Sequence, residues 1–523
     1  MRTNAAETQT GQGLFSMDIG LGGELSRRRK LPPLLHCSAA ALICLAVMLL
    51  NGCSAGPDYA RPATETPAAF KEAGWKTADP KDTQIKGKWW EIYNNPELNA
   101  LEEQVAVSNQ NVAAAEAQYR QAKALVQATR AALFPTAGIS ATPSRSDTLT
   151  SSNGVPTRVI SSDYLLTGSV SWELDLWGKT RRAVEASEAS AQASAADLAA
   201  MRLSMQSSLM QDYFQLRALD SQKMLLDQTI AEYQKFLEIT KNRYKTGVAA
   251  QTDILNAETQ LSNVQAQAID TTVQRAQLEH AIAVLTGKPP SAFSLPLAPL
   301  AIEPPSVPVG LPSDLLERRP DIAAAERAMA AANAQIGVAK AAYYPSLSLN
   351  GAGGFNATQF SDWLVWPSRY WSLGTTLSET LFDGGLRGAQ TDQALAAYEA
   401  SVANYRQTVL TGFQEVEDNL AALRILSHEA QVQGKTVQSS LRAAAITVNQ
   451  YKAGTASSLD VVTAQTIALN SQVTAMGIDS RLMVAHGLLI SALGGGWDAS
   501  ALDTGGQKAQ KEEGRDTETA VGP

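Results

Sequence analysis

The stretch Leu166-Thr-Gly-Ser-Val-Ser-Trp-Glu-Leu-Asp-Leu176 alternates apolar and polar side chains along its whole length. Because successive side chains of a β-strand point to opposite faces, this period of two predicts a strand with one apolar and one polar face. A second stretch repeats the alternation, with polar residues between Trp371, Leu373 and Leu377. Glu379 falls on the apolar face of that pattern, which predicts that the strand bulges or ends near it.

Weaker alternation follows Pro135 and Pro345 and predicts a partner strand for each of these stretches. Segments of roughly ten residues with this pattern suit an outer-membrane β-barrel, although an amphipathic sheet on a soluble core has equal local support. The export signal described below favours the barrel. The residues of the weaker alternation are Ala137, Ile139, Ala141, Leu347, Leu349 and Gly351.

Four strands per chain cannot close a membrane barrel, because the smallest known barrels have eight. An open sheet edge in lipid would leave backbone groups without hydrogen-bond partners. The strand count therefore predicts an oligomer in which several chains share one barrel, and it leaves both two and three chains open.

Very long helices are predicted after each strand pair. The residues from Trp177 to Tyr244 contain no proline, and at ~1.5 Å per residue they would form a rod of about 100 Å. Apolar residues in both helices step by four, three and four, as in a coiled coil. These residues are Leu226, Ile230, Tyr233 and Leu237 in the first helix, and Val409, Phe413, Val416 and Leu420 in the second.

Ordered matches between the halves of the chain predict an internal two-fold repeat. Tyr244-Lys-Thr-Gly247 aligns with Tyr451-Lys-Ala-Gly454, and Asp253 aligns with Asp460. Each half reads as a helix, two strands, a very long helix, a turn and a helix. The predicted boundaries are an N-terminal segment at 53–100, repeats at 101–288 and 313–497, an equatorial linker at 289–312 and a disordered tail at 498–523.

Residues 1–52 are predicted to be a lipoprotein signal peptide. A basic cluster at 27–30 precedes an apolar run from Ser38 to Leu50, which as a helix would reach only ~20 Å and could not cross a ~30 Å hydrocarbon core. Leu50-Asn-Gly-Cys53 resembles the bacterial lipoprotein box, in which Cys53 becomes the lipidated first residue. Cleavage beside an incidental cysteine is the alternative, and translation starts at Met1 or Met17.

Composition excludes several classes of protein. The chain has 43 basic and 51 acidic residues and a net charge of −8, without the basic field that nucleic-acid binding requires. Three cysteines and four histidines exclude a disulfide scaffold and a multi-cysteine zinc site. We predict no catalytic residue, no metal site and no cofactor other than the lipid on Cys53. A lipid-anchored exported hydrolase and a structural coiled-coil lipoprotein are the alternatives.

Short motifs in a fixed order carry a family resemblance. They include Cys53-Ser-Ala-Gly-Pro-Asp-Tyr59, Asn95-Pro-Glu-Leu98, Arg318-Arg-Pro-Asp-Ile322, Leu381-Phe-Asp-Gly-Gly385 and Leu493-Gly-Gly-Gly-Trp497. Together they resemble the outer-membrane efflux channel family, the TolC-like proteins, in its NodT/OprM-like lipoprotein branch. The resemblance implies an α+β membrane protein: a homotrimer with a twelve-stranded barrel in outer-membrane lipid, four strands per chain, above a coiled-coil helical tunnel across the periplasm.

The resemblance also implies the function and its sites. The expected role is the exit channel of a tripartite system, which passively conducts small molecules from a periplasmic adaptor protein and an inner-membrane pump to the exterior. In such channels the turns after the two long helices dock on the adaptor, and the second turn carries the gate, here expected at Leu459, Asp460 and Thr463. An alternative is that Asp460 only caps the helix that follows. The expected docking residues are Gly247, Val248, Ala249, Ala250, Gly454, Thr455, Ala456 and Ser457.

Overall fold

The computed structural model describes residues 54–63, 67, 70–71, 87–152, 155–300, 318–497 and 499. The predictions for the signal segment, Cys53, residues 301–312 of the linker and the tail other than residue 499 lie outside these residues. The helices are η1 (Trp89–Tyr93), α2 (Pro96–Ser108), α3 (Gln110–Ala131), α4 (Lys179–Lys245), α5 (Gln251–Leu285), η2 (Pro290–Ala292), α7 (Pro320–Ala341), η4 (Phe360–Asp362), η5 (Trp366–Ser368), α8 (Leu386–Ala453) and α9 (Ser458–Ala492).

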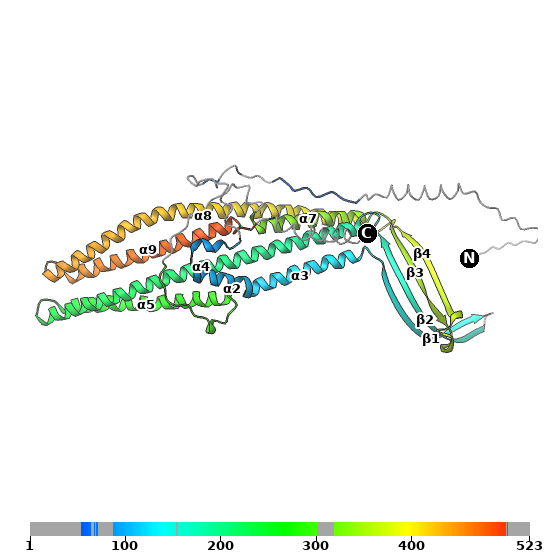
Figure 1. Ribbon diagram of the computed structural model, residues 1–523, viewed down its shortest axis with the longest axis horizontal. Helices are drawn as coiled ribbons and strands as arrows, with labels where there is room; N and C mark the ends of the chain where they lie inside the picture. The colour runs from blue at the N-terminus through cyan, green and yellow to red at the C-terminus, as the bar shows by residue number, and fades with distance from the viewer. Residues whose placement is uncertain are drawn as a thin grey trace, which may run out of the picture. The chain divides into compact units, whose positions relative to one another are not determined.

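Two very long helices organise the helical part, as the sequence predicts. Helix α4 has 67 residues and α8 has 68, so each is about 100 Å long at ~1.5 Å per residue. Helices α5 and α9 run back along α4 and α8, while α3 and α7 lie along the halves nearer the strands (Figure 1). Each long helix therefore has a different partner at each end, and the coiled-coil spacing in its sequence is that of a helix packed against neighbouring helices.

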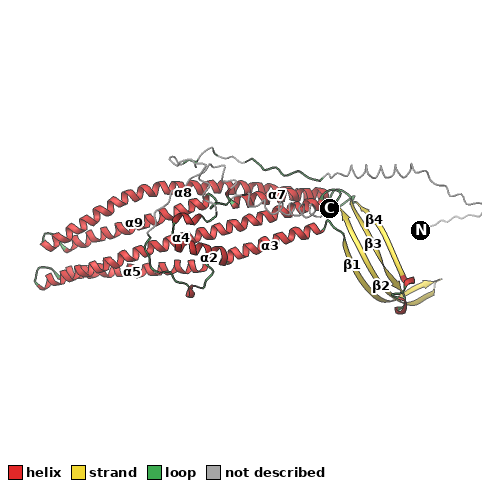
Figure 2. Ribbon diagram, in the orientation of Figure 1, coloured by secondary structure: helices red, strands yellow, loops and turns green. Residues whose placement is uncertain are grey.

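The strands form one antiparallel sheet in the order β1 (Thr136–Ser152), β2 (Val155–Leu174), β3 (Ser346–Ala357) and β4 (Arg369–Ser378) (Figure 2). Strand β4 ends one residue before Glu379, which confirms the predicted strand end. The expected length of ten residues is wrong for β1 and β2, which have 17 and 20 residues. Their outer halves pair only with each other, because β3 first meets β2 at Tyr164.

The order helix, two strands, long helix, helix occurs in both halves, with one difference. The first short helix is divided into α2 and α3 at Asn109. The Asn109 side chain accepts hydrogen bonds from the backbone N–H groups of Asn111 and Val112, and its amide donates to the Leu285 carbonyl at 2.9 Å. An asparagine in this N-cap geometry starts a new helix, so the expected continuous helix is broken here.

The largest buried cluster joins η1 and α2 to the middle of α4 and α8 and to the C-terminal half of α9, with Trp89, Phe214, Leu420 and Leu489 among its members. Helix α9 is the one helix of the described residues that is long and apolar enough to cross a membrane, by length and composition only. Since Leu489 and its neighbours in the last turns of α9 are buried against the other helices, we assign α9 to this core.

Candidate functional site: the sheet faces and the helical turns

The two faces of the sheet differ in chemistry. Residues paired across neighbouring strands share a face, so the register places Val170, Gly351 and Leu373 in one row. That face is apolar over its central rows, whereas the opposite face carries mainly hydroxyl and amide groups such as Ser171 and Asn350, whose side chains hydrogen-bond at 3.0 Å. The apolar face comprises Ala137, Ile139, Leu166, Val170, Trp172, Leu174, Leu347, Leu349, Phe355, Trp371, Leu373 and Leu377.

The first helical turn joins α4 to α5 through the predicted segment Gly247 to Ala250. Gly247 has a φ of 75°, a left-handed conformation that favours glycine and closes the end of α4. The Asp253 carboxylate accepts a hydrogen bond from the backbone N–H of Ala250 at 2.9 Å and thereby caps α5. Val248 at the point of the turn is exposed.

The second turn joins α8 to α9 in the same way. Gly454 has a φ of 81°, and Ser457 and Asp460 cap α9 reciprocally: the Ser457 N–H donates to Asp460 at 2.9 Å and the Asp460 N–H donates to the Ser457 hydroxyl at 3.2 Å. Hydrogen bonds from the Ser457 hydroxyl and backbone lower the pKa of Asp460. The Asp460 side chain is thus a cap, while Leu459 and Thr463 lie exposed one helical turn apart.

A basic residue at the end of α4 links the two turns. The Arg243 guanidinium lies 4.5 Å from the centre of the Tyr451 ring and also donates to the Tyr451 carbonyl in the last turn of α8. The Tyr451 hydroxyl donates to Thr240 at 3.4 Å. Sequence reasoning does not find this contact, since its partners are 208 residues apart and the repeat motif that begins at Tyr451 does not indicate Arg243 as its partner.

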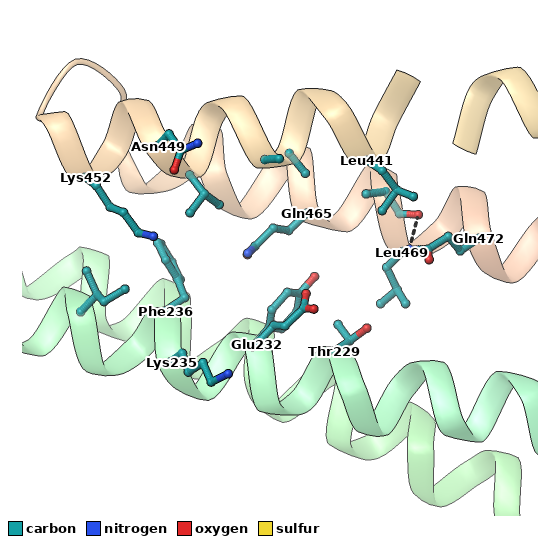
Figure 3. Close-up of a pocket in the computed structure, with 16 residues that line it drawn as sticks. Thr229, Glu232, Lys235, Phe236, Leu441, Asn449, Lys452, Gln465, Leu469 and Gln472 are labelled. Carbon is teal, nitrogen blue, oxygen red and sulfur yellow. Dashed lines mark hydrogen bonds between the residues drawn. The ribbon is translucent and has the colours of Figure 1, made fainter. Parts of the chain in front are cut away.

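Beside this link, a cleft of about 520 Å³ lies between α4 and the pair α8 and α9. Figure 3 shows Phe236 and Leu469 on its apolar sides and Lys452 reaching toward Phe236 from the end of α8. Glu232, Gln465 and Gln472 supply polar groups. The two helix pairs are therefore not fully packed against each other near the turns.

Buried ion pairs fix the segments that surround the helices at mid-length. The side chain of Asp220 is fully buried and accepts hydrogen bonds from Arg217 at 2.8 Å and from Arg275 at 2.6 Å. Arg217 also pairs with Glu97 of α2 and donates to the Pro296 carbonyl at 2.7 Å. One charged cluster thus joins α2, α4, α5 and the chain that follows η2.

The residues after Cys53 are held where the helices meet the sheet. The Ala55 N–H donates to the Trp177 carbonyl at 3.1 Å, and Arg182 donates to Asp58 at 2.7 Å. Gly56 packs so closely on α7 that an added Cβ would lie 2.5 Å from the Cα of Gly337. The backbone that follows Cys53 therefore lies against the first turns of α4 and the end of β2.

Glu102 of α2 is an uncompensated buried acid. Its side chain is fully buried, and neither carboxylate oxygen has a hydrogen-bond partner among the described residues. Burial raises the pKa of Glu102 to about 9. Between a pH of about 5 and 9 the folded chain keeps a proton that the unfolded chain has lost, so stability falls as the pH rises through this range.

We therefore predict that Glu102→Gln raises the unfolding midpoint at pH 8 and has little effect at pH 4.5. The wild-type protein should lose up to about 1.4 kcal/mol of unfolding free energy per pH unit from this group. Heat unfolding followed by circular dichroism at several pH values measures the effect. Glu103→Gln, at an exposed neighbouring position, is the matched control. Parallel pH profiles for wild type and Glu102→Gln would contradict the prediction.

Among the described residues, no group of three or more histidine, cysteine, aspartate or glutamate side chains is placed to hold a metal ion. Within the same residues, the described site consists of an amphipathic sheet and two capped helical turns.

Comparison with known proteins now decides the family. The model of the family described as outer membrane efflux protein matches residues 101–288 and 311–495. This chain belongs to that family. It is 30% identical over 448 residues to the pyoverdine export outer membrane protein OpmQ of Pseudomonas putida, covering 84% of this chain and 95% of the relative. It is 29% identical to nodulation protein T of Rhizobium leguminosarum bv. trifolii, with 87% of this chain and 97% of the relative covered.

Solved structures of outer-membrane channels share the fold. The channel OprN matches with a TM-score of 0.79 and 30% identity over 85% of this chain and 100% of OprN. The open state of the Neisseria gonorrhoeae MtrE channel matches with a TM-score of 0.76 and 26% identity over 86% and 99%. The chain is thus an outer-membrane efflux channel protein, as the motif order predicts, and its relatives are channel proteins.

Proposed function

We propose that three copies of this chain form a twelve-stranded outer-membrane barrel above a periplasmic helical tunnel, as the passive exit duct of a tripartite efflux system. The observation that carries the proposal is the sheet: it has two unpaired edges, β1 and β4, and one apolar and one polar face. In a closed barrel the apolar face contacts lipid, the polar face lines a wet lumen, and no edge remains.

The energy for transport comes from an inner-membrane pump that a periplasmic adaptor connects to this channel. The relatives include a pyoverdine export protein and a toluene efflux pump protein, so the proposed cargo is small molecules as a class. The hydrolase and structural-lipoprotein alternatives leave the two-faced sheet without a role.

The two repeats at 101–288 and 313–497 serve this duct as quasi-equivalent units, so that three chains supply six similar segments to one wall. Each unit contains a glycine-closed turn after its long helix, and both turns lie at the same end of the bundle (Figure 1). We place the adaptor on these turns, at Gly247 to Ala250 and Gly454 to Ser457. Their exposure and their helix caps present short, defined loops to the ends of adaptor helices.

Cys53 is proposed to carry the lipid, after removal of residues 1–52. The contacts of Ala55 and Asp58 with Trp177 and Arg182 support this assignment, because they hold the backbone that follows Cys53 beside the end of the sheet. A diacylated residue there lies at the inner surface of the membrane that the sheet spans.

We predict that mass spectrometry finds Cys53 lipidated at the mature N-terminus; an unmodified N-terminus at another residue would contradict it. Cys53→Ala should block processing without abolishing barrel assembly.

The gate is proposed at Leu459, with Asp460 and Thr463 beside it. Three symmetry copies of the exposed Leu459 side chain would form an apolar constriction, which restricts ion flow in the resting channel. Three copies of Asp460 would add a ring of negative charge, although in this chain its carboxylate also caps α9.

We predict that the purified oligomer conducts ions in planar bilayers and that Leu459→Gly raises its resting conductance several-fold. Asp460→Ala should reduce cation selectivity. Asp253→Ala is the matched control, because it removes the equivalent cap from α5 and leaves the predicted constriction intact. Unchanged single-channel currents in both second-turn variants would place the gate elsewhere, and a purified oligomer without conductance would overturn the channel function itself.

A further inference from the structure

Two adjacent apolar side chains lie almost fully exposed where the sheet meets the helices. Leu381 is 92% and Phe382 89% exposed, in the loop between β4 and α8. Phe134, immediately before β1, is 67% exposed. These residues flank the inner ends of β4 and β1, the two edge strands of the sheet.

The backbone around each group is fixed, so the side chains are presented outward. Arg387 donates to the Thr380 carbonyl and to the Asp383 carboxylate, both at 2.6 Å, and so holds the residues on either side of Leu381 and Phe382. Asp383 also accepts from the Gly385 N–H at 2.9 Å.

The loop before β1 is held in a similar way. The Trp172 indole N–H donates to the Leu133 carbonyl at 3.0 Å, and the Phe134 N–H donates to the Ala131 carbonyl at 3.1 Å. Rigid loops that each expose large apolar side chains are typical of contact surfaces.

In a barrel of several chains, the geometry brings Leu381 and Phe382 of one copy close to Phe134 of the neighbouring copy. Within one chain, Thr136, Ser171, Asn350 and Gly374 lie in one row across the sheet. Four strands at ~4.8 Å spacing and a tilt of roughly 35–45° require a stagger of about four to six residues per chain, and the stagger must be even because residues paired across the seam share a face. Because β1 begins at Thr136, that stagger can only run toward its later residues.

Gly374 then faces Ser140 or Thr142 of the neighbouring copy, four or six positions after Thr136 and on the same polar face. In an antiparallel pair, each later residue of β4 faces an earlier residue of β1. Continuing the register with a stagger of six places Phe382 opposite Phe134 of the neighbouring copy, with Leu381 beside it. A stagger of four places Leu381 and Phe382 one and two positions from the residue opposite Phe134.

We propose that Leu381 and Phe382 of one copy clamp onto Phe134 of the next and seal each seam of the barrel at its periplasmic rim. The clamp rests on the trimeric barrel proposed above. Its occupant is a second copy of this chain, since the unpaired edges of β1 and β4 require such a neighbour and the stagger matches these residues in position. It would exclude water where the edge pairing begins and direct β4 to the correct edge.

Cysteine pairs test the clamp in the full-length protein in its membrane. Phe134→Cys combined with Leu381→Cys, or with Phe382→Cys, is oxidised and analysed on non-reducing gels, while native mass spectrometry measures the trimer content. The control pair is Phe134→Cys with Phe360→Cys, because Phe360 is also exposed but lies in the β3–β4 loop at the other end of the strands. Single-cysteine variants give the background.

At least one clamp pair should give tenfold more covalent dimer and trimer than the control pair. Trimers without disulfide products from either clamp pair would overturn the clamp alone. A protein that forms no trimer would overturn both the clamp and the trimeric channel, so the two failures are distinguishable.

Discussion

Replacing Arg217 by methionine is expected to cause the largest loss of stability of any single substitution in the helical part. The Arg217 side chain is 2% exposed and that of Asp220 is fully buried. Methionine keeps much of the volume but leaves Asp220 with one guanidinium partner instead of two, and leaves the Pro296 carbonyl without its donor. Breaking a buried pair by removing one partner costs about 3–5 kcal/mol.

Two measurements check this expectation. Heat unfolding in detergent, followed by far-ultraviolet circular dichroism, should show a midpoint lower by several degrees. Limited proteolysis should become faster near Leu295 and Pro296, whose carbonyls accept from Arg275 and Arg217. Arg202→Met is the matched control, because Arg202 lies exposed on the same helix and surface changes alter stability by about 0.5 kcal/mol or less. Equal midpoints for the two variants would show that the cluster does not support the helical core.

The periodic parts of the fold are predictable from the sequence, because side chains at a fixed spacing along a strand or helix share the same apolar or polar environment. The alternation around Leu373 reports the two faces of β4, and the steps from Leu226 to Tyr233 report a buried seam of α4. The outer halves of β1 and β2 lack this signal, since residues such as Ser161 and Ser162 are polar on both faces. Backbone pairing and polar side-chain contacts such as the Arg158–Asp147 ion pair hold them together, and neither leaves an apolar alternation from which their length could be predicted.

The parts that sequence reasoning missed join residues that are distant along the chain. Arg217 meets Glu97 across 120 residues, and Arg243 meets Tyr451 across 208. No periodicity marks such pairs, because each depends on how whole helices pack. The caps are different: Ser457 and Asp460 stand three residues apart, and this local spacing is enough to predict a capping box. The capping geometry of Asp460 is thus one of the two alternatives that the sequence analysis gives for this residue.

The second large effect follows from the orientation of the sheet. Arginine substitutions at two neighbouring positions of β4 are expected to differ strongly in their effect on assembly in the outer membrane. Leu373 lies on the apolar face, midway between the row of Phe355 and Arg369 and the row of Leu347 and Leu377. Ser372 lies on the opposite face. If the apolar face meets lipid, Leu373 is near the middle of the bilayer, where an arginine costs about 2–4 kcal/mol per chain.

Leu373→Arg should therefore abolish assembly in the outer membrane, because a trimer carries this cost three times. Ser372→Arg adds the same side chain one residue away and should assemble, since it enters a wet lumen. Fractionated membranes and the heat-resistant trimer on gels measure assembly, and the assembled Ser372→Arg channel should also become less permeable to cations, because its lumen gains positive charge. Equal assembly of the two variants would show that the apolar face does not contact lipid, and the barrel would then have to be abandoned. Failure of Ser372→Arg alone would contradict the assignment of the hydroxyl-rich face to the lumen.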